Sequence, residues 1–172
     1  MASLKLTRAV ATRSKLKRES LMPAESTGAI LGNWYVTLTK VDDVNVFVYM
    51  SERTLISFVM TEGERITPGK LFTSFIRGLL LVLEMAGYSG AVLDRILHDY
   101  STGTVSPAND PSLLGSLTNI ALDYAAFIEH DGGLSRCSIS EIVMHINSLP
   151  SKRLGFKSPL EVTAALLQSV AT

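Results

Sequence analysis

Alternating apolar and polar residues predict β-structure between residues 31 and 62. The alternation over 34–39 predicts a strand, and the nearly continuous apolar run over 44–50 predicts a central strand that is covered on both faces. The pair Asp42-Asp43 separates these two runs and is typical of a tight hairpin turn. A third strand is expected over 54–60. Because the connections are short, the three strands are predicted to form an antiparallel meander.

From residue 67 onward, apolar residues recur every three or four positions, which predicts a helical half over 67–172. A capping residue followed by proline marks three helix starts, at Thr67-Pro68, Asp110-Pro111 and Ser158-Pro159. Ser138 and Glu141 have the spacing of a capping box at a fourth start. Residues 101–109 are expected to form a loop or an edge strand.

A short alternation around Leu4 and Leu6 predicts one more strand, followed by a basic helical turn over 14–21. The elements together predict an α+β protein, in which a small, mainly antiparallel sheet of about four strands packs against four or five helices. The 172 residues are expected to form one domain, with residues 1–21 as a basic N-terminal arm.

The composition favours a soluble protein with a partner surface. Hydrophobic residues make up 47% of the chain and charged residues 19%, an apolar surplus that is typical of homo-oligomers. No uninterrupted apolar run is longer than that of residues 79–83, so no membrane-spanning helix is predicted and the expected location is the cytoplasm. Cys137 is the single cysteine, which excludes an internal disulfide and a cysteine-rich metal site.

Basic residues are concentrated at the N-terminus. Residues 1–18 hold six of the 16 basic residues and no acid, so the rest of the chain has 10 basic and 16 acidic residues. Such a segment either pairs with the acidic remainder or contacts phosphates. The candidate nucleic-acid-binding residues are Arg13, Lys15, Lys17, Arg18, Lys152, Arg153 and Lys157.

Motifs of known catalytic chemistry are missing, so no catalytic residue, metal ligand or cofactor is predicted. The three histidines lack ligand spacing, and no nucleophile elbow, Walker or dinucleotide glycine pattern occurs. Residues 150–162 look like the closing segment of many bacterial transposases, which need three carboxylates holding two divalent metals on a five-stranded sheet of the ribonuclease H type. No carboxylate follows a predicted buried strand, and the chain is too short for that core plus a DNA-binding domain, so this class is disfavoured.

A stripe of small polar residues runs along the helix predicted after Asp110. It consists of Ser112, Ser116, Asn119 and Asp123, and it lies opposite the apolar face of that helix. The stripe is either a solvent face or a surface that packs closely against a partner or ligand. The candidate ligand- or partner-binding residues are Ser116, Asn119 and Asp123, together with Arg53 at a strand turn, whose guanidinium is suited to an anion.

Four segments in fixed order carry a resemblance to a known family. They are LGNWY at 31–35, SERTL at 51–55, LGSLTN at 114–119, and the tail from Leu149-Pro150 to Ser158-Pro159-x-Glu161. Together they resemble a family of small bacterial domains of unknown function, over residues 3–168. The resemblance implies an N-terminal strand and basic helix, a meander and a helical C-terminal half, but no reaction. Members of that family often have Asp at position 33 and Asn-Asp at 119–120, where this chain has Asn33 and Asn119-Ile120.

Three functional hypotheses follow. In the favoured one the protein is a non-catalytic bacterial binding or regulatory module that acts through protein contacts, with another protein or with itself as a homodimer. In the second it is a nucleic-acid-associated accessory factor that uses the basic N-terminus. In the third it is an enzyme whose site the sequence does not reveal.

Overall fold

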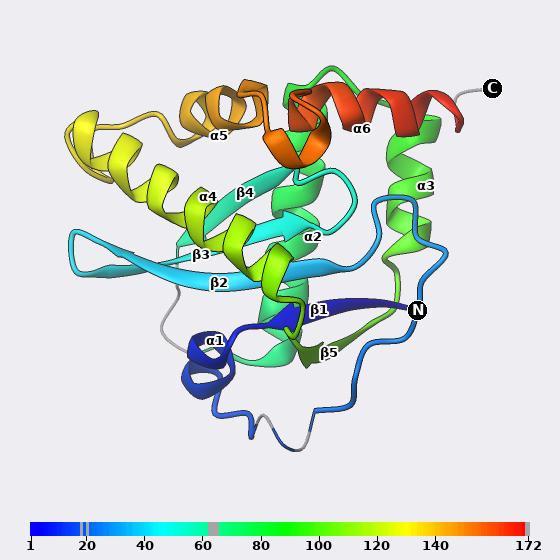
Figure 1. The fold of residues 1–172 in the computed structure, drawn as a ribbon, viewed down its shortest axis with the longest axis horizontal. Helices are drawn as coiled ribbons and strands as arrows, with labels where there is room; N and C mark the ends of the chain where they lie inside the picture. Colours follow the sequence, from blue (N-terminus) through cyan, green and yellow to red (C-terminus); the bar gives the residue numbers. More distant parts are fainter. Residues whose placement is uncertain (18, 20, 62–65, 171–172) are drawn as a thin grey trace.

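The sheet has five strands, one more than the sequence predicts. We analysed a computed structural model that describes residues 1–17, 19, 21–61 and 66–170. The strand order is β4-β3-β2-β1-β5 (Figure 1). Strands β2 (Trp34–Val41), β3 (Val44–Ser51) and β4 (Ser57–Thr61) form the predicted antiparallel meander. Asp42 and Asp43 both have positive φ, as a tight hairpin turn of the I′ type requires.

The N-terminal strand lies inside the sheet and is not part of a separate arm. Strand β1 (Ala2–Leu6) pairs in parallel with β2 on one side and with β5 (Gly103–Pro107) on the other. The sheet is therefore mixed, with its antiparallel part limited to the meander. The first helix also differs from its prediction, because α1 spans Arg8–Arg13 and ends where a basic turn was expected to begin.

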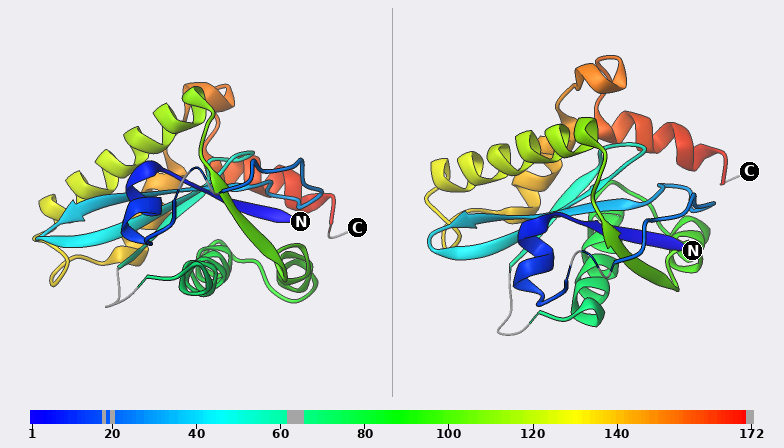
Figure 2. Two further views of the ribbon diagram at one scale, coloured as in Figure 1. Left: turned by 90° about the horizontal axis from the view of Figure 1, so that it is seen from below. Right: turned by 60° about the horizontal axis from the view of Figure 1, so that its bottom comes forward.

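Helices cover both faces of the sheet. Helices α2 (Pro68–Met85) and α3 (Ala91–Asp99) lie on one face and α4 (Pro111–His130) lies on the other (Figure 2). Helix α5 (Ile139–Ser148) contacts α2, α4 and the edge strand β4, and α6 (Pro159–Gln168) packs against α5. Within the described residues, none of the helices combines the length and apolar character needed to cross a membrane.

The helix starts follow the predicted capping chemistry. Thr67 accepts a hydrogen bond from the backbone N–H of Lys70, and Asp110 accepts from those of Ser112 and Leu113. Ser158 and Glu161 form a complete capping box. These local bonds fix where α2, α4 and α6 begin, and so position the face on which the candidate site lies.

An aromatic cluster fills the space between the sheet and α2. The ring of Trp34 lies 5.6 Å from that of Phe58 and 5.2 Å from that of Phe75, and all three side chains are buried. The indole N–H of Trp34 donates to the hydroxyl of Tyr100 over 3.1 Å, and that hydroxyl donates to the carbonyl of Gly32 over 2.7 Å. The cluster is thus both densely packed and satisfied in its hydrogen bonds.

Replacing Gly78 with alanine is expected to destabilise the protein by about 1–3 kcal/mol, although alanine is the better helix former. Gly78 is buried in the middle of α2, and an added Cβ would overlap the ring of Phe58, which the aromatic cluster holds in place. Urea unfolding measures the change. Gly115→Ala on α4 is the matched control, because a Cβ there meets nothing within 4 Å and should stabilise the helix by about 0.5–1 kcal/mol. Equal effects at both positions would refute the close packing at Gly78.

Candidate functional site

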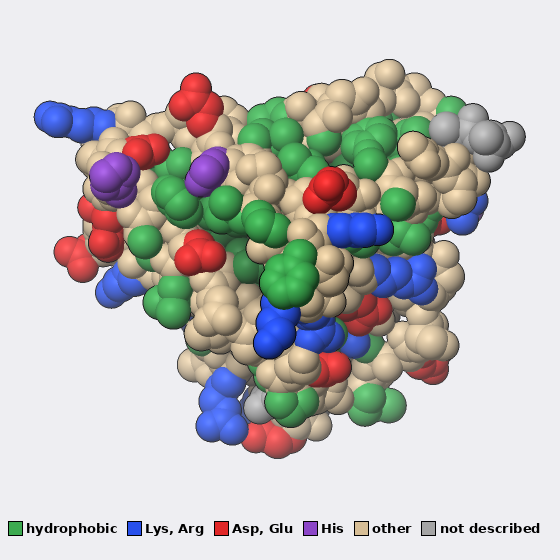
Figure 3. All heavy atoms as spheres, turned by 45° about the horizontal axis from the view of Figure 1, so that its top comes forward, with side chains coloured by type: hydrophobic (Ala, Val, Ile, Leu, Met, Phe, Trp, Pro, Cys, Tyr) green, Lys and Arg blue, Asp and Glu red, His purple; other side chains and the backbone are tan. Residues whose placement is uncertain are grey.

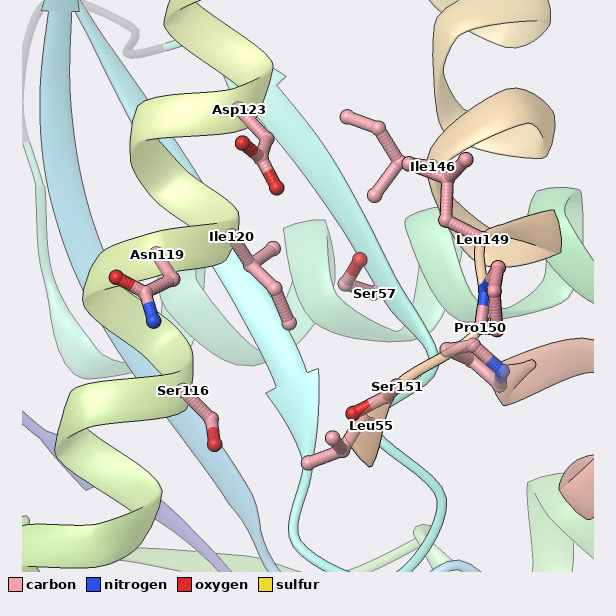
Figure 4. A pocket seen from close by; sticks show the side chains of 11 residues that line it. Leu55, Ser57, Ser116, Asn119, Ile120, Asp123, Ile146, Leu149, Pro150 and Ser151 are labelled. Carbon is pink, nitrogen blue, oxygen red and sulfur yellow. The ribbon is translucent and has the colours of Figure 1, made fainter. Parts of the chain in front are cut away.

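A pocket of about 180 Å³ lies between α4 and the connection from α5 to α6. Helix α4 forms one wall, and the end of α5 with residues 149–151 forms the other (Figure 4). Leu55, two residues before β4, and Ser57, its first residue, lie at the base between the two walls. The pocket is therefore built from segments far apart in sequence, which only the folded chain brings together.

The polar stripe of α4 faces this pocket. Ser116, Asn119 and Asp123 line it, and Ile120 extends from the same helix between them (Figure 4). Among the described residues, neither the Asn119 amide nor the Asp123 carboxylate has a hydrogen-bond partner, and both residues are exposed. Three of the four predicted binding residues thus lie together at a hollow, with unused hydrogen-bonding capacity.

The base of the pocket is held by one buried amide. The Oδ1 of Asn147 accepts from the backbone N–H of Ser57 over 2.9 Å, and its Nδ2 donates to the Ser57 carbonyl over 2.8 Å. The same Nδ2 also donates to the carbonyl of Val143 on α5. Asn147 therefore replaces a neighbouring strand at the edge of β4, and joins α5 to the sheet.

A tyrosine from α4 completes this support. The hydroxyl groups of Ser57 and Tyr124 lie 2.9 Å apart, and both residues are fully buried. Burial raises the pKa of the Tyr124 phenol, so the hydroxyl stays protonated at physiological pH. Because Tyr124 of α4 and Asn147 of α5 both hydrogen-bond to Ser57, the two walls of the pocket are fixed relative to each other.

The turn over residues 151–157, here called the basic turn, borders the pocket. Its ends are bridged by the bond from the Ser151 N–H to the Lys157 carbonyl, 3.0 Å long. The N–H groups of Leu154 and Phe156 both donate to the Ser151 carbonyl, over 3.0 and 2.8 Å. Arg153 donates to the hydroxyl of Ser112 and so ties the turn to the start of α4.

The basic turn presents cations and one aromatic side chain to solvent. Lys152, Arg153 and Lys157 are exposed, and Phe156 is 71% exposed. Figure 3 shows the face of the molecule that carries α4 and the α5–α6 connection, where Lys and Arg side chains gather near the middle beside exposed hydrophobic ones. Glu161 lies close behind the turn. The Ser158 N–H, which donates to its carboxylate, holds the pKa of Glu161 below its usual range.

Arg53 does not belong to this pocket. Its guanidinium donates to the carbonyls of Ile30 and Thr27, over 3.2 and 3.1 Å, and so fastens the loop that precedes β2. The sequence placed Arg53 at a strand turn but contained no signal for the direction of its side chain. The structure thus separates it from Ser116, Asn119 and Asp123.

The described cations among the predicted nucleic-acid-binding residues are divided between two distant places. Helix α1 lies at the lower end of the molecule in Figure 1, whereas the α5–α6 connection lies at the upper end. Arg13 and Lys17 each interact with other groups of the chain, Lys15 is exposed, and Arg18 lies outside the described residues. The six cations that the structure describes therefore do not form one continuous surface.

A second polar cluster, which the sequence did not reveal, lies where β2 begins beside β1. Lys5 Nζ is 2.9 Å from a carboxylate oxygen of Glu52 and 5.1 Å from the ring centre of Tyr35. Burial would lower the pKa of Lys5, but the hydrogen bond and charge of Glu52 outweigh it and raise that pKa overall. The other oxygen of Glu52 accepts from the backbone N–H of Asn33 over 2.8 Å. Lys5, Glu52 and the Asn33 N–H thus pair with one another and stabilise the sheet, whereas the buried Tyr35 hydroxyl has no hydrogen-bond partner among the described residues.

The half-buried carboxylates and two exposed ones have similar structural partners. Asp42 accepts from the Leu134 N–H over 2.8 Å, and Asp99 accepts from the Ile30 N–H and from Arg95. Asp110 and Glu161 cap helices. In the part of the chain that the structure describes, no three His, Cys, Asp or Glu side chains are grouped so that they could hold a metal ion.

Most of the chain matches the sequence model of one protein family. Residues 3–162 match the model of a family described as a domain of unknown function, DUF6933. The chain belongs to the DUF6933 family. This match confirms the kind of family that the ordered motifs predicted. No curated protein matches the DUF6933 chain in sequence.

A solved structure has a fold similar to that of this DUF6933 chain. The catalytic core domain of BIV integrase is similar, with a TM-score of 0.54 and 11% sequence identity. The match covers 81% of this chain and 97% of the integrase domain. At this identity the likeness establishes the fold alone.

Proposed function

We propose that this DUF6933 protein is a non-catalytic binding module that acts through protein contacts, and that its pocket receives one side chain of the partner. The single observation that carries the proposal is the pocket at the polar stripe of α4. Cofactor and small-molecule sites usually measure about 300–1,000 Å³. A pocket of about 180 Å³ suits one side chain better than a whole cofactor.

The chemistry of the pocket supports this choice. Asn119 and Asp123 retain free donors and acceptors, while Leu55, Ile120 and Leu149 provide apolar contact. A hollow that is part apolar, with a few polar groups at its rim, is typical of the places where protein partners insert anchor residues. The half-buried carboxylates Glu52, Asp99 and Asp110 all have structural partners, which favours binding over catalysis. The division of the basic residues between two ends of the molecule gives the nucleic-acid hypothesis less support.

Photo-crosslinking tests the proposal. Benzoylphenylalanine at position 119 is expected to give discrete protein adducts in cells, because this position opens on the pocket. The same residue at position 129, which is exposed on α4 but does not line the pocket, is the matched control and should give several-fold less. Mass spectrometry of the adducts identifies the bound protein. Equal adducts at both positions, or none at position 119, would contradict a protein-binding role for this pocket.

A further inference from the structure

Phe156 combines two features that do not stabilise the isolated chain. It has φ of +65°, in the left-handed region that bulky residues avoid, and its side chain is 71% exposed. Glycine would adopt this conformation without strain, as Gly155 does beside it with φ of +64°. Strained residues of this kind cluster at functional sites such as active sites, ligand clamps and switch regions.

The basic turn holds Phe156 rigidly. The bridge between Ser151 and Lys157, the bond of the Phe156 N–H to the Ser151 carbonyl, and the capping box at Ser158 fix the backbone on both sides. An aromatic side chain on an ordered backbone loses little conformational entropy when it binds. Such residues are frequent among those that dominate the energy of protein interfaces.

The projecting ring and the pocket lie side by side. Ser151 accepts the bond from the Phe156 N–H and also lines the pocket, so the two features share a wall. The pocket has the size of one large side chain, and Leu55, Ile120 and Leu149 contribute apolar surface to it. One face of the molecule therefore carries an aromatic projection and a hollow into which such a group can fit.

The charges of the two features are complementary. The basic turn carries Lys152, Arg153 and Lys157, whereas Asp123 is the one charged residue of the pocket lining and has no partner among the described residues. In a two-fold arrangement each basic turn faces the pocket of the other molecule, and both contacts form at once. Such an interface is closed, because the same patch is used on both sides.

We propose that the partner at this face is a second copy of the chain, and that Phe156 of each copy occupies the pocket of the other. This inference rests on the proposed function, because it names the protein that the pocket binds. It also assigns a role to residues 150–162, which lead into the start of α6. The capping of that helix does not require the exposed aromatic and basic residues of this segment.

Sedimentation velocity across a range of concentrations, with two complementary variants, tests the dimer. Phe156→Gly removes the ring and relieves the backbone strain, so the chain stays folded, and the dimer dissociation constant should rise about thirtyfold. Ile120→Trp fills the pocket and should weaken the dimer to a similar extent. Leu122→Ala is the matched control, since Leu122 is a 62% exposed residue of α4 outside the pocket lining, and it should leave the dimer unchanged.

Mixing the two variants gives the sharpest result. Phe156→Gly keeps its pocket and Ile120→Trp keeps its projection, so a mixed dimer regains one of the two contacts that each variant dimer lacks. The mixture should therefore associate more tightly than either variant alone, though less tightly than the wild type. An unrelated interface would show no such recovery, and that result would overturn the inference.

The remaining outcomes separate the inference from the proposed function. A wild-type protein that stays monomeric, while position 119 crosslinks to a different protein, overturns the dimer and leaves the binding module intact. A monomer without crosslinks overturns both. Co-sedimentation of the wild type with a single-stranded oligonucleotide, lost on Lys152→Glu with Lys157→Glu, would overturn both proposals in favour of a nucleic-acid surface.

Discussion

Replacing Asn147 with leucine is expected to lower the free energy of unfolding by about 3–5 kcal/mol. Leucine has a similar size but no hydrogen-bonding group, so the N–H and carbonyl of Ser57 would stay buried without a partner. Each unsatisfied buried group costs about 1–3 kcal/mol. Urea unfolding followed by fluorescence of Trp34, the one tryptophan of the chain, measures the loss as a shift of the midpoint.

The matched control for this change is Asn119→Leu. It makes the same chemical substitution on α4, where the amide is exposed and has no partner among the described residues, so the expected change is within about 0.5 kcal/mol. If the two variants lose the same stability, Asn147 does not hold α5 on the edge of β4 in the way that the structure indicates.

Stability is expected to fall steeply above pH 10. Tyr49, Tyr100 and Tyr124 are buried, and burial raises the pKa of each phenol above its ordinary value of 10.0. Above pH 10 the unfolded chain loses these protons while the folded chain keeps them, so unfolding is favoured as pH rises. Each tyrosine contributes about 1.4 kcal/mol per pH unit, or about 4 kcal/mol in total at pH 11. Lys5 acts in the same direction, because its pKa is also raised and its stabilising effect is lost at alkaline pH.

Urea midpoints at pH 8, 10 and 11, measured at one ionic strength, give this dependence. In Tyr49→Phe the loss between pH 8 and 11 should be smaller by about 1.4 kcal/mol, because one titrating phenol is removed. Tyr88→Phe changes a partly exposed tyrosine and should reduce the loss by less. A wild-type midpoint that is constant up to pH 11 would contradict the burial of the three phenols.

Local signals in the sequence predicted the meander and the helix starts, because both are encoded by neighbouring residues. The hairpin at Asp42-Asp43 and the proline-containing caps need no information from elsewhere in the chain. The position of β1 was missed for the opposite reason. Its alternation predicts a strand, but its parallel neighbours are set by packing with residues 34–36 and 103–107, which no local pattern specifies.

The candidate site was predicted in part, for a similar reason. Helical spacing placed Ser116, Asn119 and Asp123 on one face of α4, and the structure brings that face to the pocket. The opposite wall depends on how Asn147 positions α5 and on the path of the chain after Leu149. Neither can be derived from periodicity. Arg53 was grouped with the stripe on side-chain chemistry alone, although its guanidinium is used by the loop before β2.

The chain resembles an integrase core in fold, but this likeness does not by itself extend to catalytic residues. The sequence analysis disfavoured the transposase class because its acids are not spaced for two metals, and the described residues contain no three-residue group that could bind one. The chain nevertheless has a fold similar to that of the BIV integrase catalytic core. A shared sheet topology therefore gives no support for a shared reaction, and the pocket at α4 is the better basis for a functional proposal.

The placement of β1 between β2 and β5 has a consequence for biosynthesis. Ala2 lies opposite Gly103, so one side of the N-terminal strand has no neighbour until about a hundred more residues have left the ribosome. During that interval the nascent chain exposes unpaired backbone groups of a hydrophobic strand to solvent. Slow translation before residue 107 would lengthen this interval, and would make the growing polypeptide a good client for chaperones that bind extended apolar segments.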